Sequence, residues 1–163
     1  MGVAGFSPDD IDASRPCGRG LRAHEPSWRH LEAASVQGDA LALASASASA
    51  ARILLADGDG DEALWHLQRG RRFLASPGLC LHSLAMLCEL ATLKLQVAAL
   101  QDEHDPQAAR HLRDTTRDDL FDLVRRALEL TDGTPAVLQA ADILQALGDT
   151  VDADTLRHRV LQS

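Results

Sequence analysis

The feature that most constrains the fold is a long apolar segment at residues 79–101, "LCLHSLAMLCELATLKLQVAALQ". His82, Glu89 and Gln96 recur in it every seven residues, so a helix here has a single narrow polar stripe. A helix with so little polar surface must be covered by neighbouring helices. Lys94 and Glu89 would be costly inside a lipid bilayer. We therefore predict a helix buried at the centre of the fold and not a membrane span.

The rest of the chain also favours helix. Ala and Leu dominate and Tyr is absent, whereas strands are usually rich in aromatic and β-branched residues. Residues 1–26 lack periodicity and are predicted to be a flexible tail, followed by a single all-α domain over residues 27–163. Asp61 and Thr134 are expected to act as helix N-caps. Periodicity and Gly or Pro breaks predict about seven helices, over residues 28–37, 39–56, 62–75, 79–101, 107–130, 135–147 and 152–161.

The run "SASASA" at residues 45–50 imitates the alternation of a strand. Ala and Ser pack poorly on a pleated sheet, and the flanking "ALALA" and "ARILLA" propagate a helix. Small side chains allow neighbouring helix backbones to approach closely. We predict that this run is a helical packing surface.

The segment "ASAARILLADGDGDEALWHLQRGRRFLASP", residues 48–77, resembles a tetratricopeptide-type repeat, in which two antiparallel helices are joined by a tight Gly-Asp turn. The matching positions are Ala51, Leu54, Gly58, Asp59, Ala63, Leu67 and Gly70. A weaker match near the end of the chain has Ala127, Pro135, Ala141, Leu144, Gly148 and Asp149 in corresponding places. The helix pair at residues 79–130 is longer than a repeat of ~34 residues. The resemblance implies stacked helical hairpins and a role in protein-protein interaction.

Charge and cysteine content narrow the partners and the compartment. A net charge of -8 argues against direct nucleic-acid binding, and the N-terminus has no secretory signal pattern. The three cysteines, Cys17, Cys80 and Cys88, lack the spacing of a disulfide framework. This absence is typical of proteins of the reducing cytoplasm. Cys80 and Cys88 are expected to be small core residues.

An acidic peptide partner would have to be bound by arginine, because the chain has a single lysine. The expected partner is another protein, a peptide or a second copy of the chain, with no membrane involved. The residues predicted to bind it are Arg69, Arg71, Arg72, Arg113 and Arg117.

Two patterns resemble metal sites and are incomplete. "DGDGD" at residues 57–61 has the first acidic positions of a calcium loop, but Glu62 stands where such loops need Gly and Gln68 where they need Glu. A capped helix turn explains the pattern better. His82 and Glu89 lie two helical turns apart, too far to share an ion without other ligands. We expect His82 to be a buried, hydrogen-bonded histidine.

"DDLFD" at residues 118–122 matches the DDxxD motif with which terpene-type synthases hold magnesium and a diphosphate. Asp118 and Asp122 would share a helix face. The rest of such a site is missing, since the chain is short and contains no Asn for the second motif. An acidic face paired with neighbouring arginines is the simpler interpretation. We predict no catalytic residue, no metal and no cofactor.

Three functions fit these observations. The first is a small cytoplasmic interaction module, an adaptor or scaffold, whose helical hairpins bind a protein. The second is a regulatory or sensor domain that holds a small ligand beside the central helix and acts with a transcription-factor partner. A buried pocket containing His82 and Glu89 would favour it. The third is a metal-dependent enzyme using Asp118, Asp119 and Asp122.

Overall fold

The computed structural model describes residues 40–75 and 80–162, and in this part of the chain all regular secondary structure is helical. The all-α prediction is therefore confirmed. Six of the expected helices are present. The expected helix at residues 28–37, the tail at residues 1–26 and Cys17 lie outside the described residues.

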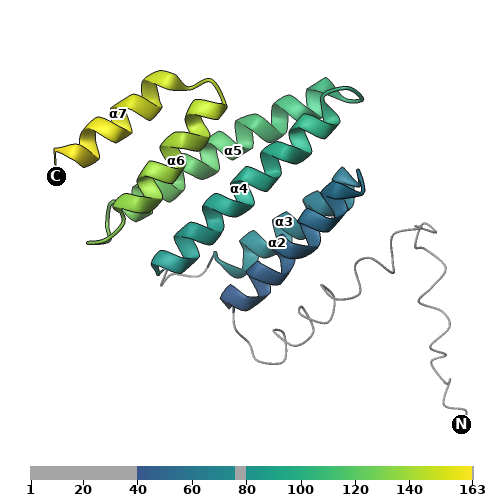
Figure 1. Ribbon diagram of the computed structural model, residues 1–163, viewed down its shortest axis with the longest axis horizontal. Coiled ribbons are helices and arrows are strands. Elements are labelled where there is room, and N and C mark those ends of the chain that lie inside the picture. The colour runs from purple at the N-terminus through teal and green to yellow at the C-terminus, as the bar shows by residue number, and fades with distance from the viewer. Residues whose placement is uncertain (1–39, 76–79, 163) are drawn as a thin grey trace, which may run out of the picture.

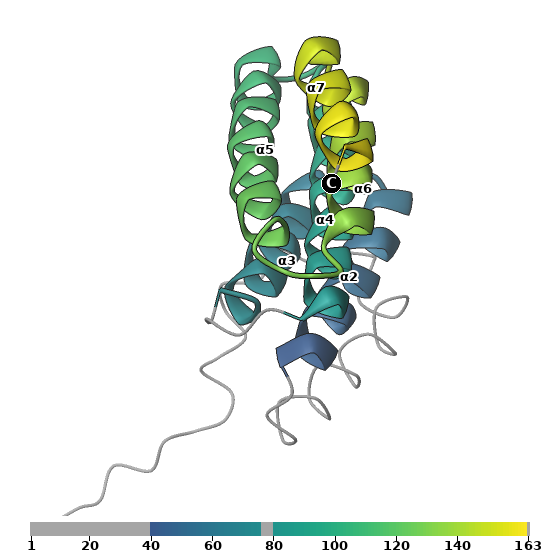
Figure 2. The ribbon, with the colours of Figure 1, turned by 90° about the vertical axis from the view of Figure 1, so that its left-hand side faces the viewer.

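Consecutive helices pair into three antiparallel hairpins, α2 with α3, α4 with α5 and α6 with α7, which lie side by side (Figure 1). Helix α4 also contacts α2, α3 and α6. In Figure 2, α5 lies to the left of α4 and α6 to its right. The bounds are Ala40–Ala56 for α2, Gly60–Phe73 for α3, Leu81–Gln101 for α4, Pro106–Ala127 for α5, Thr134–Ala146 for α6 and Thr150–Leu161 for α7.

The hairpins form two layers. Helices α2, α4 and α6 are neighbours in one layer, because α4 contacts both of the others. Helices α3 and α5 pack on the other side of α4, and among the described residues they bring no Cα atoms within 8 Å of each other. The α3 and α5 helices therefore flank α4 without touching through their backbones.

The turns between the helices follow from caps and glycines. The Asp59 carboxylate accepts the N–H of Glu62 at 3.1 Å and so caps α3, which corrects the prediction that Asp61 is the cap. Asp105 caps α5 in the same way, through the N–H of Ala108 at 3.0 Å. The cap position of α6 is held by Gly133, so the prediction of Thr134 was one residue late.

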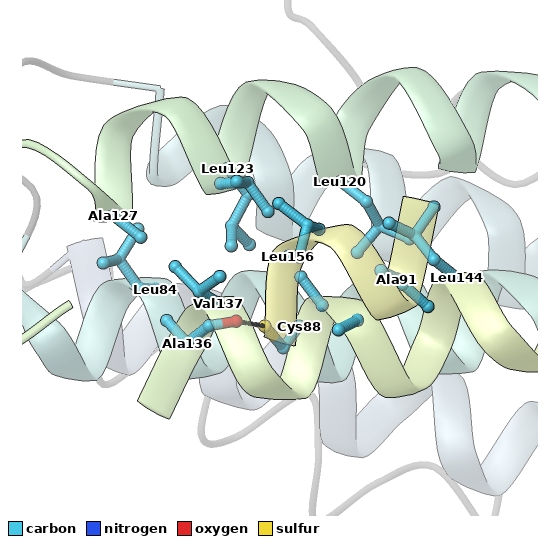
Figure 3. Packing of buried hydrophobic residues seen from close by; sticks show 14 residues of the cluster. Leu84, Cys88, Ala91, Leu120, Leu123, Ala127, Ala136, Val137, Leu144 and Leu156 are labelled. Carbon is cyan, nitrogen blue, oxygen red and sulfur yellow. Dashed lines mark hydrogen bonds between the residues drawn. The ribbon is translucent and has the colours of Figure 1, made fainter. Parts of the chain in front are cut away.

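The core is built on both sides of α4. One cluster includes Leu84 with Leu120 of α5 and Leu144 of α6 (Figure 3). A second cluster joins Val97 to Leu54 of α2 and to α3. All five of these side chains are at most 2% exposed. The predicted central position of α4 is confirmed.

The alanine and serine run is helical and packs against neighbouring helices, as predicted. Ala48 within the run, and Ala44 and Ala51 on either side of it, are at most 1% exposed. Ser47 is fully buried, and its hydroxyl satisfies its hydrogen-bonding capacity locally by donating to the carbonyl of Leu43 at 2.9 Å. The run therefore contributes close packing between α2 and its neighbours.

Helix α4 is long and apolar enough to cross a membrane by length and composition, a property that it shares with the core helices of soluble proteins. In this structure α4 packs against α2, α3, α5 and α6, and these helices cover many of its apolar residues.

Candidate binding sites

An open groove crosses the layer formed by α2, α4 and α6. Its volume is about 630 Å³, within the range of protein ligand sites. The polar stripe of α4 faces it through His82 and Glu89. The remaining lining residues are Leu41 and Ser45 of α2, Ala85, Met86, Cys88 and Thr92 of α4, and Gln139, Asp142 and Ile143 of α6.

His82 is exposed at this groove, so the prediction of a buried histidine at this position was wrong. Among residues 40–75 and 80–162, no helix covers that side of α4, so its polar stripe faces outward. The buried histidine of the described residues is His66 of α3, which is 1% exposed and makes an edge-to-face contact with Trp65.

Ion pairs occupy the two carboxylates of the groove. Glu89 pairs with Arg52 of α2, and Asp142 accepts a hydrogen bond from Arg157 of α7 at 2.7 Å. His82 is the third groove residue with an acidic or imidazole side chain. Because arginines neutralise both carboxylates, the groove presents mainly neutral polar groups and apolar side chains to a ligand.

A smaller cavity of about 130 Å³ lies on the opposite side of α4, between α3 and α5. Its charged residues are linked across three helices: the Asp119 carboxylate pairs with Arg71 of α3 at 2.5 Å and with Lys94 of α4 at 3.2 Å. Asp122 pairs with Arg126 at 2.9 Å. The apolar lining residues are Leu64, Leu67, Leu74, Ala75, Leu87, Leu90, Ala91, Leu120 and Leu123.

The arginines predicted to bind a partner are spread over the molecule. Arg71 lines the cavity, as described above. Arg69 lies over the rings of Trp65 and Phe73, at 5.3 and 5.7 Å from their centroids. Arg72 is exposed and forms no ion pair with any described residue. The structure thus places Arg69 and Arg72 on one helix, away from the lining of the α2–α4–α6 groove.

The other two predicted arginines form intramolecular ion pairs. Arg113 donates two hydrogen bonds to Asp102, at 3.1 and 2.6 Å, and thereby ties α5 to the end of α4. Arg117 donates to Asp149, in the turn before α7, at 2.5 Å and to Asp114 at 2.9 Å. Both side chains therefore hold turns and helices together.

The acidic motif at residues 118–122 divides its carboxylates between two environments. Asp118 is exposed, whereas Asp119 and Asp122 face the cavity and pair with basic side chains. A hydrogen bond from Arg125 holds the pKa of Asp122 below its ordinary value. No group of three His, Cys, Asp or Glu side chains in residues 40–75 and 80–162 is arranged to hold a metal ion.

In the acidic turn at residues 57–61, two of the carboxylates accept hydrogen bonds that stabilise the fold. Asp59 caps α3, and Asp61 accepts a hydrogen bond from Gln101 of α4 at 3.0 Å. Gly58 has a positive φ of 81°, which allows the tight reversal. These bonds fit the predicted helix turn.

The two described cysteines differ in environment. Cys88 is buried as predicted, and Figure 3 shows its Sγ directed at the carbonyl of Ala136, 3.8 Å away. Burial raises the pKa of this thiol to about 11. Cys80 is exposed, so its prediction as a core residue was wrong, because it precedes the first turn of α4. A hydrogen bond with Ser83 lowers the pKa of Cys80.

Sequence reasoning missed two sets of residues. In the sequence Lys94 is only a charge on the central helix, yet it lies at the cavity with Asp119. Trp65, which is 49% exposed, was not singled out. Its spacing of four residues from Arg69, and of eight from Phe73, is the signal that places all three on one helix face.

The described residues form an all-α protein of paired helices, with an open groove across α2, α4 and α6 and a smaller cavity between α3, α4 and α5. The chain matches no protein-family model, no curated protein and no solved structure.

Proposed function

We propose that the chain is a protein-protein interaction module of tetratricopeptide-like type, an adaptor or scaffold that binds a segment of another protein in the α2–α4–α6 groove. The observation that carries the proposal is the open groove of about 630 Å³ across three neighbouring helices. A groove shared by adjacent helices presents an extended surface to a peptide or to a partner helix.

The chemistry of the groove suits a protein segment. Leu41, Met86 and Ile143 supply apolar contacts, and Met adapts its shape to different partners. Thr92 and Gln139 supply neutral hydrogen-bonding groups. A partner segment with alternating apolar and polar side chains would satisfy both.

The arrangement of the helices gives a second line of support. The first helices of the three hairpins, α2, α4 and α6, are neighbours, and the second helices α3 and α5 are separated. In stacked helical hairpins each repeat contacts its neighbours, and the stack presents an extended concave surface for binding. We extend the proposal to a cytoplasmic location, which cell fractionation with an antibody to the chain would test.

The proposal is tested by affinity capture with two matched variants. Ala85 and Ala99 are both exposed on α4, and only Ala85 lines the groove. The wild-type chain and Ala99→Arg should recover the same partner from an extract of the native cells, whereas Ala85→Arg should not. Equal recovery by Ala85→Arg would exclude the groove as the binding site.

A second candidate function is a ligand-sensing domain that acts with a partner such as a transcription factor. The cavity of about 130 Å³ beside α4 favours it. We expected a buried pocket containing His82 and Glu89 to favour this function. Those two residues line the open groove instead. Recovery of a small molecule with the protein purified from its native cells would support a sensor.

A further inference from the structure

We propose that the cavity between α3, α4 and α5 binds a small apolar monocarboxylate, with its hydrocarbon part among the leucines and its carboxylate beside Lys94. This site is separate from the α2–α4–α6 groove, since the two lie on opposite sides of α4 and share no lining residue. Each can therefore be tested without the other.

The size of the cavity selects the ligand. A volume of about 130 Å³ is close to the ~150 Å³ of a protein cavity that takes up benzene. A phenyl ring or a short branched alkyl chain fills such a space, whereas a nucleotide or a sugar is too large for it. Leu87, Leu90 and Leu120 supply apolar walls from two helices.

A small residue in the wall of the cavity leaves its space unfilled. Ala91 of α4 lines the cavity and is 8% exposed. A larger apolar residue at this position would fill the void and add packing contacts, because unfilled space forfeits dispersion energy. An alanine there keeps room for a ligand.

The charges around the cavity select an anion. Its lining includes three cationic side chains, Arg71, Lys94 and Arg126, and two carboxylates, Asp119 and Asp122. The cavity thus has an excess of one positive charge, although the whole chain has a net charge of -8. A carboxylate balances this excess, and a cationic head group would increase it.

Lys94 is the side chain best placed to bind the carboxylate. It is 15% exposed and shares Asp119 with Arg71, so one acidic group is divided between two cations. Its ammonium group has three donors, of which Asp119 uses one. A bound carboxylate would accept another in a setting with little competing water.

The test is titration of the full chain with benzoate, benzyl alcohol and benzylamine, followed by two-dimensional amide NMR. We expect benzoate to shift the resonances of cavity residues and to bind on the order of tenfold more tightly than benzyl alcohol, with benzylamine weakest. Nuclear Overhauser contacts should join the ring protons to the methyl groups of Leu87 and Leu120. No shift with benzoate at millimolar concentration would overturn the proposal, as would equal affinities for the acid and the alcohol.

Variants separate the cavity from general surface charge. Lys94→Met should weaken benzoate binding by about tenfold, and Arg72→Met, which removes an exposed cation outside the cavity, should leave it unchanged. Ala91→Leu should abolish binding of both benzoate and benzyl alcohol. If Lys94→Met does not fold, the comparison of benzoate with benzyl alcohol on the wild-type chain decides the question. Binding that survives in Ala91→Leu would contradict the assignment.

Discussion

Gly70 of α3 lies against Ser47 of α2 so closely that a Cβ atom on Gly70 would be 3.1 Å from the Cβ of Ser47. The same added atom would be 3.5 Å from the carbonyl oxygen of Ala44, which belongs to the α2 backbone. The two helices therefore pack with small residues on both sides, in the manner predicted from the alanine and serine run. This contact fixes the first hairpin and, through it, one side of the groove.

A large side chain at Gly70 should separate α2 from α3. We expect Gly70→Leu to lower the free energy of unfolding by about 1–3 kcal/mol, because overpacking forces shifts of the neighbouring backbone. Gly60→Ala is the control, since its Cβ would meet Val97 at an ordinary 3.6 Å, and it should change stability by less than about 1 kcal/mol. Urea denaturation measures both, and a Gly70→Leu variant as stable as the wild type would refute the close contact.

Asp119 should matter for stability where the adjacent Asp118 does not. Asp119→Asn removes the carboxylate shared by Arg71 and Lys94, and we expect a loss of about 1–3 kcal/mol in the free energy of unfolding, since the partly buried Lys94 loses its carboxylate partner. Asp118→Asn changes an exposed side chain and should have little effect. Thermal unfolding with and without magnesium completes the test, and stabilisation by magnesium that depends on both residues would instead support a metal site.

The two described cysteines should react at very different rates. In a Cys17→Ser background, a thiol reagent at neutral pH should modify Cys80 rapidly, because this thiol is exposed and its pKa is lowered. Cys88 should react only as the protein unfolds, because it is buried and its pKa is raised to about 11. Mass spectrometry over time distinguishes the sites. Modification of both at one rate would show that the α4–α6 contact is open.

Acidification should weaken the link between α4 and α5. A hydrogen bond from Arg113 lowers the pKa of Asp102 in the folded chain. The contribution of the Asp102–Arg113 pair to stability is therefore present above the pKa of Asp in the unfolded chain, near 4, and is lost as the pH falls below that value. We expect the decrease in urea midpoint between pH 6 and pH 3 to be smaller in Arg113→Met than in the wild type. Arg110→Met, which removes an exposed arginine of the same helix, should retain the wild-type decrease.

Much of the fold could be predicted because it depends on local pattern. The apolar residues of α4 required neighbours on several sides, and the breaks at Gly58 and Gly148 follow from backbone geometry that glycine adopts easily. The positions of Asp59 and Gly133 as caps were each missed by one or two residues. Several residues at such a turn can cap a helix, and the packing of the hairpin selects one.

The candidate sites were harder to predict, since they depend on which helices meet. The polar stripe at His82 was read as part of a buried helix, and only the absence of a helix over that side of α4 in the described structure makes it a groove. The association of Arg71, Lys94 and Asp119 joins residues up to 48 positions apart on three helices. No periodicity within one helix reports such a contact.

The most direct test of the interaction function is hydrogen exchange of the full chain with and without the captured partner. We predict added protection at residues 82–92 of α4 and 139–143 of α6, the segments that line the groove. Protection confined to residues 65–73 of α3, around Arg69 and Arg72, would contradict it and would favour the arginine surface as the binding site.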